Sequence, residues 1–465
     1  MTNPRLAGAL LAGTLALGSC RGPAPRQTPS TADAAPLHRA VHALSSVIVY
    51  DIFSPPQASR VYAYTSIAAY EVMRQGDSRY RSLAGQLPGL QSIPTPPAAQ
   101  DISLTLAGVH AFMAVGRALT FSQARMDSLR GAMDAELSAP LSADVAERSI
   151  AYGDVVAKHI LAWAGGDHYK ESRGMPKYSV NADTGRWIPT PPAYTDAVEP
   201  NWRVIRPFTL DSASQFRPEP PHPFDLRPAS PFYRELREVY ETGRALSEEQ
   251  RAIASFWDCN PYVMHVQGHT MFATKKITPG GHWMGIVGIL TRKANFGTAR
   301  TAETYARTAI ALADGFISVW EEKYYSNFIR PETVINKYVD DSWAPLLQTP
   351  PFPEYTSGHS VITTAAASVL TQQFGENFAF ADSSEVEFGM PVRSFPSINA
   401  AAAEAAISRL YGGIHFRRAI EQGQAEGRRV GQQVVQRLQT HGEAPLATQP
   451  ATGTPASTTP ARATP

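Results

Sequence analysis

The sequence is poor in cysteine and has no excess of charge of one sign. Its 465 residues include two cysteines, Cys20 and Cys259, which are too few for a disulfide framework or a four-cysteine zinc site. Lys and Arg number 42 and Asp and Glu number 41, so the formal net charge is +1. This balance argues against a nucleic-acid-binding protein that relies on general basic charge. It leaves room for a local cationic pocket, because net charge says nothing about clustering.

Long hydrophobic runs are missing too. Beyond the N-terminal stretch 6–17, no segment approaches the length of about 18 apolar residues that a transmembrane helix needs. The apolar stretch 6–17 is too short to span a bilayer and is typical of a signal-peptide core. It runs into Leu17-Gly18-Ser19-Cys20, which resembles a bacterial lipobox. We therefore expect a lipoprotein-type signal peptide over residues 1–19 and an exported periplasmic or cell-envelope protein, attached to a membrane only by a lipid on Cys20. An ordinary signal peptide with an incidental cysteine is the alternative.

The rest of the chain divides into a folded body and two polar ends. Residues 20–36 are predicted to be a flexible tether, and residues 441–465, rich in Pro, Thr and Ala, a disordered tail. Apolar residues recur at helical spacing in six segments of the body, namely 58–75, 100–119, 143–164, 300–325, 359–374 and 398–410. Twelve prolines between residues 176 and 231 exclude long helices there. The sequence predicts an all-α fold over 37–440, one large domain of helix bundles with long irregular Pro-rich connections.

The last third of the chain carries three candidate anion-binding blocks. In the first, Lys323 and Arg330 are seven residues apart and are predicted to share a helix face, with Pro331 ending the helix at Arg330. In the second, Ser357-Gly358 follows a Pro-rich stretch and begins a helix, where backbone N–H groups and a hydroxyl form an oxyanion cradle. His359 lies in the first turn of that helix.

The third block is Arg409, Gly412-Gly413 and His415, where the glycines permit a break that returns His415 toward Arg409. Taken singly, the first two blocks are also compatible with solvated charges or an ordinary helix cap, whereas the third is harder to explain by packing alone. Together they bring three cations to one place, where they repel one another unless a multiply charged anion lies between them. His359 is then suited to proton transfer, and His415 to attacking or coordinating the central atom.

The order and spacing of these blocks resemble the tripartite signature of type 2 phosphatidic acid phosphatases and vanadium-dependent haloperoxidases. The resemblance covers residues 255–437, with the signature blocks at 320–437. Trp320 and Phe352 are similar to the aromatic residues of the haloperoxidase halide pocket, which makes a bacterial haloperoxidase of the iodoperoxidase-like branch the closer match.

The resemblance implies a vanadate cofactor bonded to His415. Its oxygens would be held by the cofactor-binding residues Lys323, Arg330, Ser357, Gly358 and Arg409. His359, His415 and Lys323 would be catalytic, oxidising a halide, iodide or bromide, with hydrogen peroxide and halogenating a small organic acceptor. The sequence leaves the oligomeric state open.

Two positions depart from the family pattern. Thr356 replaces the proline before Ser-Gly-His, and Ala419 replaces the aspartate that orients the last histidine in the phosphatases. His415 therefore needs another partner, such as a backbone carbonyl or Glu421. An acid phosphatase with His415 as nucleophile stays open as the alternative function, and so does a non-catalytic oxyanion-binding protein.

Three further histidines receive no role in that pocket. His265 and His269, four residues apart, are suited to sharing a helix face, but no third zinc ligand accompanies them, so we interpret them as packing residues. His282, in a Pro-Gly-Gly-His-Trp run, has no assigned function.

Overall fold

The structure is a computed structural model that describes residues 33–96, 101–181 and 183–441. The expected signal peptide, the lipobox cysteine and nearly all of the expected tether and tail lie outside these ranges. The first helix, α1 (Ala35–Tyr50), begins inside the segment assigned to the tether, and His441 pairs with Tyr80 in an isolated β-bridge. Among the helices of residues 33–96, 101–181 and 183–441, none combines the length and the apolar character needed to cross a membrane.

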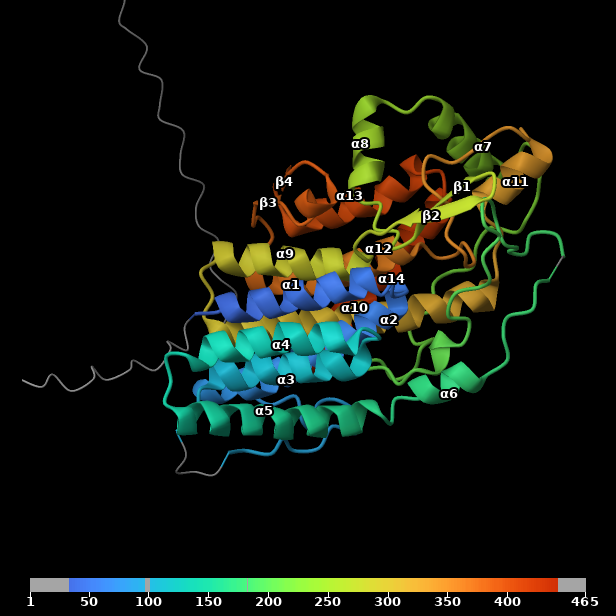
Figure 1. Cartoon of the computed structure of the whole chain (residues 1–465). Coiled ribbons are helices and arrows are strands. Elements are labelled where there is room, and N and C mark those ends of the chain that lie inside the picture. The colour runs from blue at the N-terminus through green and yellow to red at the C-terminus, as the bar shows by residue number, and fades with distance from the viewer. Residues whose placement is uncertain (1–32, 97–100, 182, 442–465) are drawn as a thin grey trace, which may run out of the picture.

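The N-terminal half is a bundle of α1 and four further helices (Figure 1). These are α2 (Pro55–Met73), α3 (Leu104–Leu119), α4 (Gln123–Ser138) and α5 (Ala143–Ala164). Serine caps begin two of them, since Ser103 accepts a hydrogen bond from the Leu106 N–H and Ser142 one from the Val145 N–H. Helix α2 is buried on nearly all sides, as expected for an apolar helix at the centre of a large domain.

The C-terminal half is a second group of helices that contains the sequence signature. It consists of α9 (Pro279–Lys293), α10 (Thr298–Ser326), α12 (Gly358–Phe374), α13 (Ile398–Tyr411) and α14 (Arg417–Arg437). Helix α10, 29 residues long, contacts α2 on one side and α12 and α14 on the other. It therefore joins the two groups into one continuous hydrophobic core.

Helices α12 and α14 lie unusually close together because α14 presents a stripe of glycines to α12. A Cβ atom on Gly427 would lie 2.1 Å from the Val361 carbonyl oxygen, and one on Gly431 would lie 2.6 Å from the Ala365 carbonyl oxygen. Neither position has room for a side chain, so the stripe holds the two helix backbones in contact. The N-terminus of α12, where Ser357 and His359 lie, is fixed against the start of α14 by the same packing.

Shorter elements complete the fold around this core (Figure 1). The remaining helices are α6 (Tyr169–Gly174), α7 (Pro231–Arg244), α8 (Glu248–Phe256), α11 (Pro331–Tyr338) and the 3₁₀ turns η1 (Arg74–Gly76), η2 (Trp202–Val204) and η3 (Val386–Phe388). The strands β1 (Val263–Gln267) and β2 (Thr270–Thr274) form one antiparallel hairpin, and β3 (Phe380–Asp382) pairs antiparallel with β4 (Arg393–Phe395).

The all-α prediction is confirmed, and the six segments with helical periodicity correspond to α2, α3, α5, α10, α12 and α13. Between α6 and α7 the described residues contain only the turn η2, as the prolines predict. The two hairpins were not predicted from the sequence. His265 lies on strand β1, so the expectation that it shares a helix face with His269 is wrong.

Candidate active site

The three sequence blocks meet at a cavity of about 310 Å³. Helix α10, the N-terminus of α12 and the link between α13 and α14 form its inner end, and loops near residues 52–55, 195–198, 258–262 and 348–352 form its walls. Among the residues that the signature singled out, those that line it directly are Trp320, Phe352, Gly358, His359, Arg409 and His415. The other predicted residues lie buried close to it.

The backbone of the first block folds differently from the prediction. Helix α10 ends at Ser326, Asn327 adopts a left-handed conformation (φ 48°), and Arg330 caps the start of the next helix, α11. Lys323 and Arg330 therefore do not share a face of one helix, and that prediction is wrong. The turn at Asn327 brings the two side chains to the same place instead.

Both cations are buried and held by backbone carbonyl groups. The Lys323 ammonium donates hydrogen bonds to the carbonyl oxygens of Pro353 (3.0 Å), Glu354 (3.0 Å) and Thr356 (2.5 Å). Arg330 donates from Nε to the Phe352 carbonyl oxygen (2.9 Å), and its Nη1 lies 3.2 Å from His415 Nε2. These bonds fix the charges in position without neutralising them.

The second block behaves as the sequence predicts. Ser357 is the N-cap of α12, and its hydroxyl oxygen accepts hydrogen bonds from the N–H (3.3 Å) and the hydroxyl (2.8 Å) of Ser360. Because Ser357 acts only as an acceptor in both bonds, its own hydroxyl proton is available for an anion. A Cβ atom on Gly358 would lie 3.8 Å from the side chains of Lys323 and Trp320, so the missing side chain leaves space inside the cradle.

The third block also folds as predicted. Helix α13 ends at Tyr411, and Gly413 adopts a left-handed conformation (φ 76°) that favours glycine. The chain then turns back, so that Arg409 and His415 line one cavity. Arg409 is anchored by a hydrogen bond from Nη2 to the Trp257 carbonyl oxygen (2.7 Å).

The partner of His415 is Glu354, a residue that the sequence interpretation missed. Glu354 is fully buried, and its Oε1 atom lies 2.8 Å from His415 Nδ1 and accepts a hydrogen bond from the Phe416 N–H (3.0 Å). Glu421, the expected alternative, points elsewhere: its side chain is 61% exposed and lies 4.0 Å from Arg417. The available sequence signal was a lone acidic residue in the apolar, Pro-rich run just before Ser357.

Thr356, the first departure from the family pattern, has a defined contact that proline lacks. Its hydroxyl donates a hydrogen bond of 2.8 Å to the carboxylate of Glu426, a buried residue of α14 that also accepts one from Ser318 (2.7 Å). Thr356 thereby links the loop before α12 to α10 and α14.

Burial dominates the electrostatics of the site. It lowers the pKa of Lys323 well below its usual value, and it lowers the pKa of Arg330 to about 10. Burial, reinforced by the neighbouring cations, also holds the pKa values of His359 and His415 well below 6.5. Burial raises the pKa of the Glu354 carboxyl to about 8. Both histidine rings are therefore neutral near pH 7, and the Nε2 lone pair of His415 accepts the hydrogen bond from Arg330 Nη1.

The two predicted halide-pocket residues contact each other on the wall of the cavity. The rings of Trp320 and Phe352 lie 4.9 Å apart between centroids, and the Trp320 indole N–H donates a hydrogen bond to the Val198 carbonyl oxygen. The Lys323 ammonium and the Arg330 guanidinium each lie 5.2 Å from the centre of the Phe352 ring. The wall of Trp320 and Phe352 thus borders the anion-binding residues directly. We call these residues, namely Lys323, Arg330, Ser357, Gly358 and Arg409, the cationic cradle.

The buried polar atoms that remain free fit a bound oxyanion. Arg330 Nη2 and His359 Nε2 are buried and have no hydrogen-bond partner among the residues that the structure describes. Buried polar atoms without partners are rare in folded proteins unless a ligand or water satisfies them. Arg330 Nη2, Arg409, the Ser357 hydroxyl and the space beside Gly358 form a set of donors suited to a tetrahedral anion such as vanadate or phosphate, and His359 Nε2 is placed to accept a proton from it.

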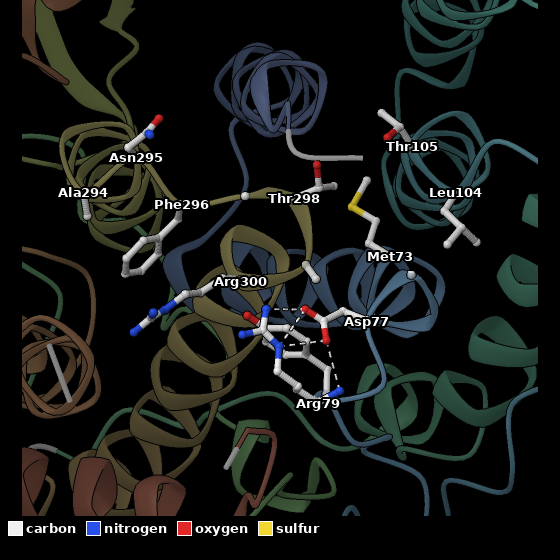
Figure 2. Close-up of a pocket in the computed structure, with 14 residues that line it drawn as sticks. Met73, Asp77, Arg79, Leu104, Thr105, Ala294, Asn295, Phe296, Thr298 and Arg300 are labelled. Carbon is white, nitrogen blue, oxygen red and sulfur yellow. Dashed lines mark hydrogen bonds and ion pairs between the residues drawn. The ribbon is translucent and has the colours of Figure 1, made fainter. Parts of the chain in front are cut away.

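A second cavity, of about 400 Å³, shares no lining residue with the first (Figure 2). It is lined by residues near Met73, Leu104 and Phe296, and Figure 2 shows Arg79 in it with its guanidinium bound to Asp77. None of the three signature blocks contributes to it, so the first cavity is the candidate active site.

The fold and the site together define an all-helical protein with a cationic oxyanion pocket and two histidines. The family model "VCPO second helical-bundle domain" matches residues 303–444. A solved bacterial vanadium-dependent iodoperoxidase is 50% identical, with 89% of this chain and 99% of that chain covered and a TM-score of 0.85. The chain therefore belongs to the vanadium-dependent haloperoxidase family, whose members are peroxidases with a vanadate cofactor.

Two more distant solved structures share the fold. The apo-type bacterial vanadium-dependent chloroperoxidase is 16% identical, with 81% of this chain and 92% of that chain covered and a TM-score of 0.60. The holo-type structure is 17% identical, with coverages of 89% and 94% and a TM-score of 0.59. No curated protein matches the chain in sequence.

Proposed function

We propose that this haloperoxidase oxidises iodide, or bromide, with hydrogen peroxide and transfers the halogen to a small organic acceptor. The observation that carries the proposal is the neutral His415, with Nδ1 held by Glu354 and Nε2 facing the cationic cradle. The 50% identity to an iodoperoxidase supports iodide as the preferred halide.

In this proposal each residue of the cradle has one task. His415 Nε2 would bond to the vanadium atom, and Glu354 would keep the ring in the tautomer that presents Nε2 as the ligand. Lys323, Arg330 and Arg409 would balance the charge of the anion. The Ser357 hydroxyl and the Gly358 N–H would donate to its oxygens.

Bound vanadate would supply Lewis-acid chemistry that activates hydrogen peroxide toward a halide. His359 would move a proton at Nε2, since this atom is buried, lacks a partner among the described residues and belongs to a neutral ring. The wall of Trp320 and Phe352 would hold a large, weakly hydrated halide next to the cations.

The test is reconstitution of the full-length apoprotein. Orthovanadate should restore iodide oxidation in the presence of hydrogen peroxide, and phosphate should compete with it because both are tetrahedral oxyanions. Activity that is insensitive to the removal and return of vanadate would contradict the proposal. Parallel assays with iodide, bromide and chloride would establish the halide preference.

One observation favours phosphomonoester hydrolysis as a second candidate function. Ala419 replaces the aspartate that orients the histidine nucleophile in the phosphatases, but Glu354 supplies an orienting carboxyl group at 2.8 Å from His415 Nδ1. In this alternative His415 would attack the phosphorus atom and His359 would protonate the leaving group. Hydrolysis of a chromogenic phosphomonoester by vanadate-free protein, lost in His415→Ala, would support it.

We also propose that the protein is exported as a lipoprotein of the periplasm or cell envelope. Support comes from the apolar segment 6–17 followed by Leu-Gly-Ser-Cys20. Mass spectrometry of the mature N-terminus in a bacterial host should find a lipid-modified Cys20. Membrane association should be lost in Cys20→Ala, and an unmodified cysteine in the mature wild-type protein would contradict the proposal.

A further inference from the structure

A second group of metal-ligating side chains lies beside the active-site cavity. It consists of Cys259, in the loop after α8, His282 on α9, and Glu385, just before η3. All three are buried, with exposed fractions of 1%, 0% and 3%. The site proposed for vanadate uses none of them.

The three ligand atoms form a compact triangle. His282 Nδ1 lies 3.3 Å from the Cys259 sulfur and 3.0 Å from Glu385 Oε1, and the sulfur lies 4.0 Å from the same carboxylate oxygen. A tetrahedral zinc ion with metal–sulfur distances of about 2.3 Å and metal–nitrogen or metal–oxygen distances of about 2.0–2.1 Å places its ligands roughly 3.3–3.6 Å apart. The observed distances bracket that range.

The histidine has the outer partner that metal-bound histidines usually have. Its Nε2 atom lies 2.8 Å from the carboxylate of Asp382, which in turn accepts hydrogen bonds from the Ser384 N–H (3.0 Å) and hydroxyl (2.6 Å). A carboxylate on the far ring nitrogen fixes the tautomer that exposes Nδ1 to a metal. The ring is also stacked on Trp257, with centroids 4.6 Å apart.

The charge of the cluster suits a divalent cation. Asp382 and Glu385 place two carboxylates on one buried imidazole, and the same imidazole contacts a thiol. A bound zinc ion would replace one proton on His282 Nδ1 and one on the Cys259 thiol. The net charge of the group would then stay unchanged.

From this geometry we propose that Cys259, His282 and Glu385 form a zinc site with a fourth position for water. One thiolate, one imidazole and one carboxylate form a ligand set that suits zinc better than magnesium or calcium. Cys259 lines the active-site cavity, which provides an entry path and room for the fourth ligand.

The proposed site has a structural link to the oxyanion cradle. Trp257, which stacks on His282, accepts the hydrogen bond from Arg409 at its carbonyl oxygen. Zinc would therefore hold residues 257–259 in place behind a cation of the cradle. The inference does not depend on the proposed halide chemistry, because metal content is measured without any turnover.

The experiment uses the full-length protein in a reductant that is not a thiol, because thiols themselves bind zinc and cobalt. After dialysis against zinc and removal of excess metal, elemental analysis should find one equivalent per chain. Cobalt in place of zinc should give a thiolate-to-cobalt charge-transfer band. Cys259→Ser should lose this band, whereas Cys20→Ser, the matched control at the other cysteine of the chain, should keep it.

Two further variants separate a metal site from a packing cluster. His282→Gln should lose the zinc, whereas His110→Gln should retain it, because His110 is a buried histidine that contacts Asp134 (2.8 Å) and Asp154 (3.1 Å) and, within the described ranges, no thiol. Asp382→Asn should weaken zinc binding by about 10- to 100-fold. Circular dichroism would confirm that each variant is folded. Folded wild-type protein that takes up no zinc, or equal uptake by wild type and Cys259→Ser, would overturn the proposal.

Discussion

The contact between Glu354 and His415 makes a quantitative prediction for Glu354→Gln. The glutamine side chain retains an oxygen that accepts from the His415 ring and from the Phe416 N–H, so the local geometry is preserved. What the variant lacks is a group that can carry a negative charge next to the imidazole and to the buried Lys323 and Arg330. Because burial raises the pKa of Glu354 to about 8, this charge is fully present only above that pH, and the variant is therefore compared with the wild type there. Charge-assisted hydrogen bonds are roughly twice as strong as neutral ones.

Changes to an outer partner of a metal-bound histidine weaken metal affinity by about 10- to 100-fold, which corresponds to about 1.4–2.8 kcal/mol. We therefore expect the dissociation constant for vanadate to rise by that factor in Glu354→Gln. Equilibrium dialysis of the apoprotein with vanadate measures this directly, and the return of iodide oxidation provides an independent titration.

The matched control is Glu71→Gln. Glu71 is also fully buried, accepts a backbone N–H from Leu83 (2.6 Å) and pairs with an arginine, Arg74, but it belongs to α2, away from the cavity. This variant should lose stability and keep wild-type vanadate affinity. A folded Glu354→Gln protein with unchanged affinity would refute the reasoning, because it would show that another group orients His415.

Three further predictions follow from burial. His415→Ala should weaken vanadate binding by more than about 100-fold in equilibrium dialysis, whereas His359→Ala should still bind and lose about 100- to 10,000-fold in the halide oxidation rate; equal binding by wild type and His415→Ala would show that the ligand is misassigned. Ala419 is fully buried in an apolar cluster, so Ala419→Asp should cost about 3–5 kcal/mol of stability in urea denaturation, and a wild-type midpoint would contradict this. Burial raises the pKa of Glu322 from 4.5 to about 8 in the folded protein. The proton on this carboxyl group therefore contributes to the free energy of unfolding in full below pH 4.5, and this contribution is lost as the pH rises through about 8. Glu322→Gln should then raise the free energy of unfolding by roughly 1–3 kcal/mol near pH 9 and hardly change it near pH 4, and an equal gain at both pH values would exclude titration as the cause.

The sequence predicted the helices and the three blocks because both depend on local spacing. Helical periodicity located α5 to the residue, and the Gly412-Gly413 break correctly predicted the return of His415. Periodicity failed at Lys323 and Arg330, because Asn327 ends the helix early in a left-handed conformation. Asparagine adopts that conformation more readily than most residues, so its position was a usable signal.

Contacts between residues far apart in the chain could not be predicted in this way. Glu354 is 61 residues before His415, and Cys259, His282 and Glu385 are brought together across 126 residues. No period or motif connects these positions, since their meeting depends on how α9, α12 and α14 pack. Such acidic partners become visible only when the fold places them next to a buried histidine.

The glycine stripe on α14 divides the molecule into a part that tolerates sequence change and a part that does not. A side chain at Gly427 would collide with the backbone of α12. Substitutions in this stripe therefore cannot shift Ser357 relative to His415 in small steps. The cavity walls near residues 52–55, 195–198 and 348–352 lie outside the described helices, apart from Pro55 at the start of α2. New halide or acceptor preferences, in nature or in directed evolution, should therefore arise by changes in these loops. The residues of the cationic cradle should stay the same in all such variants.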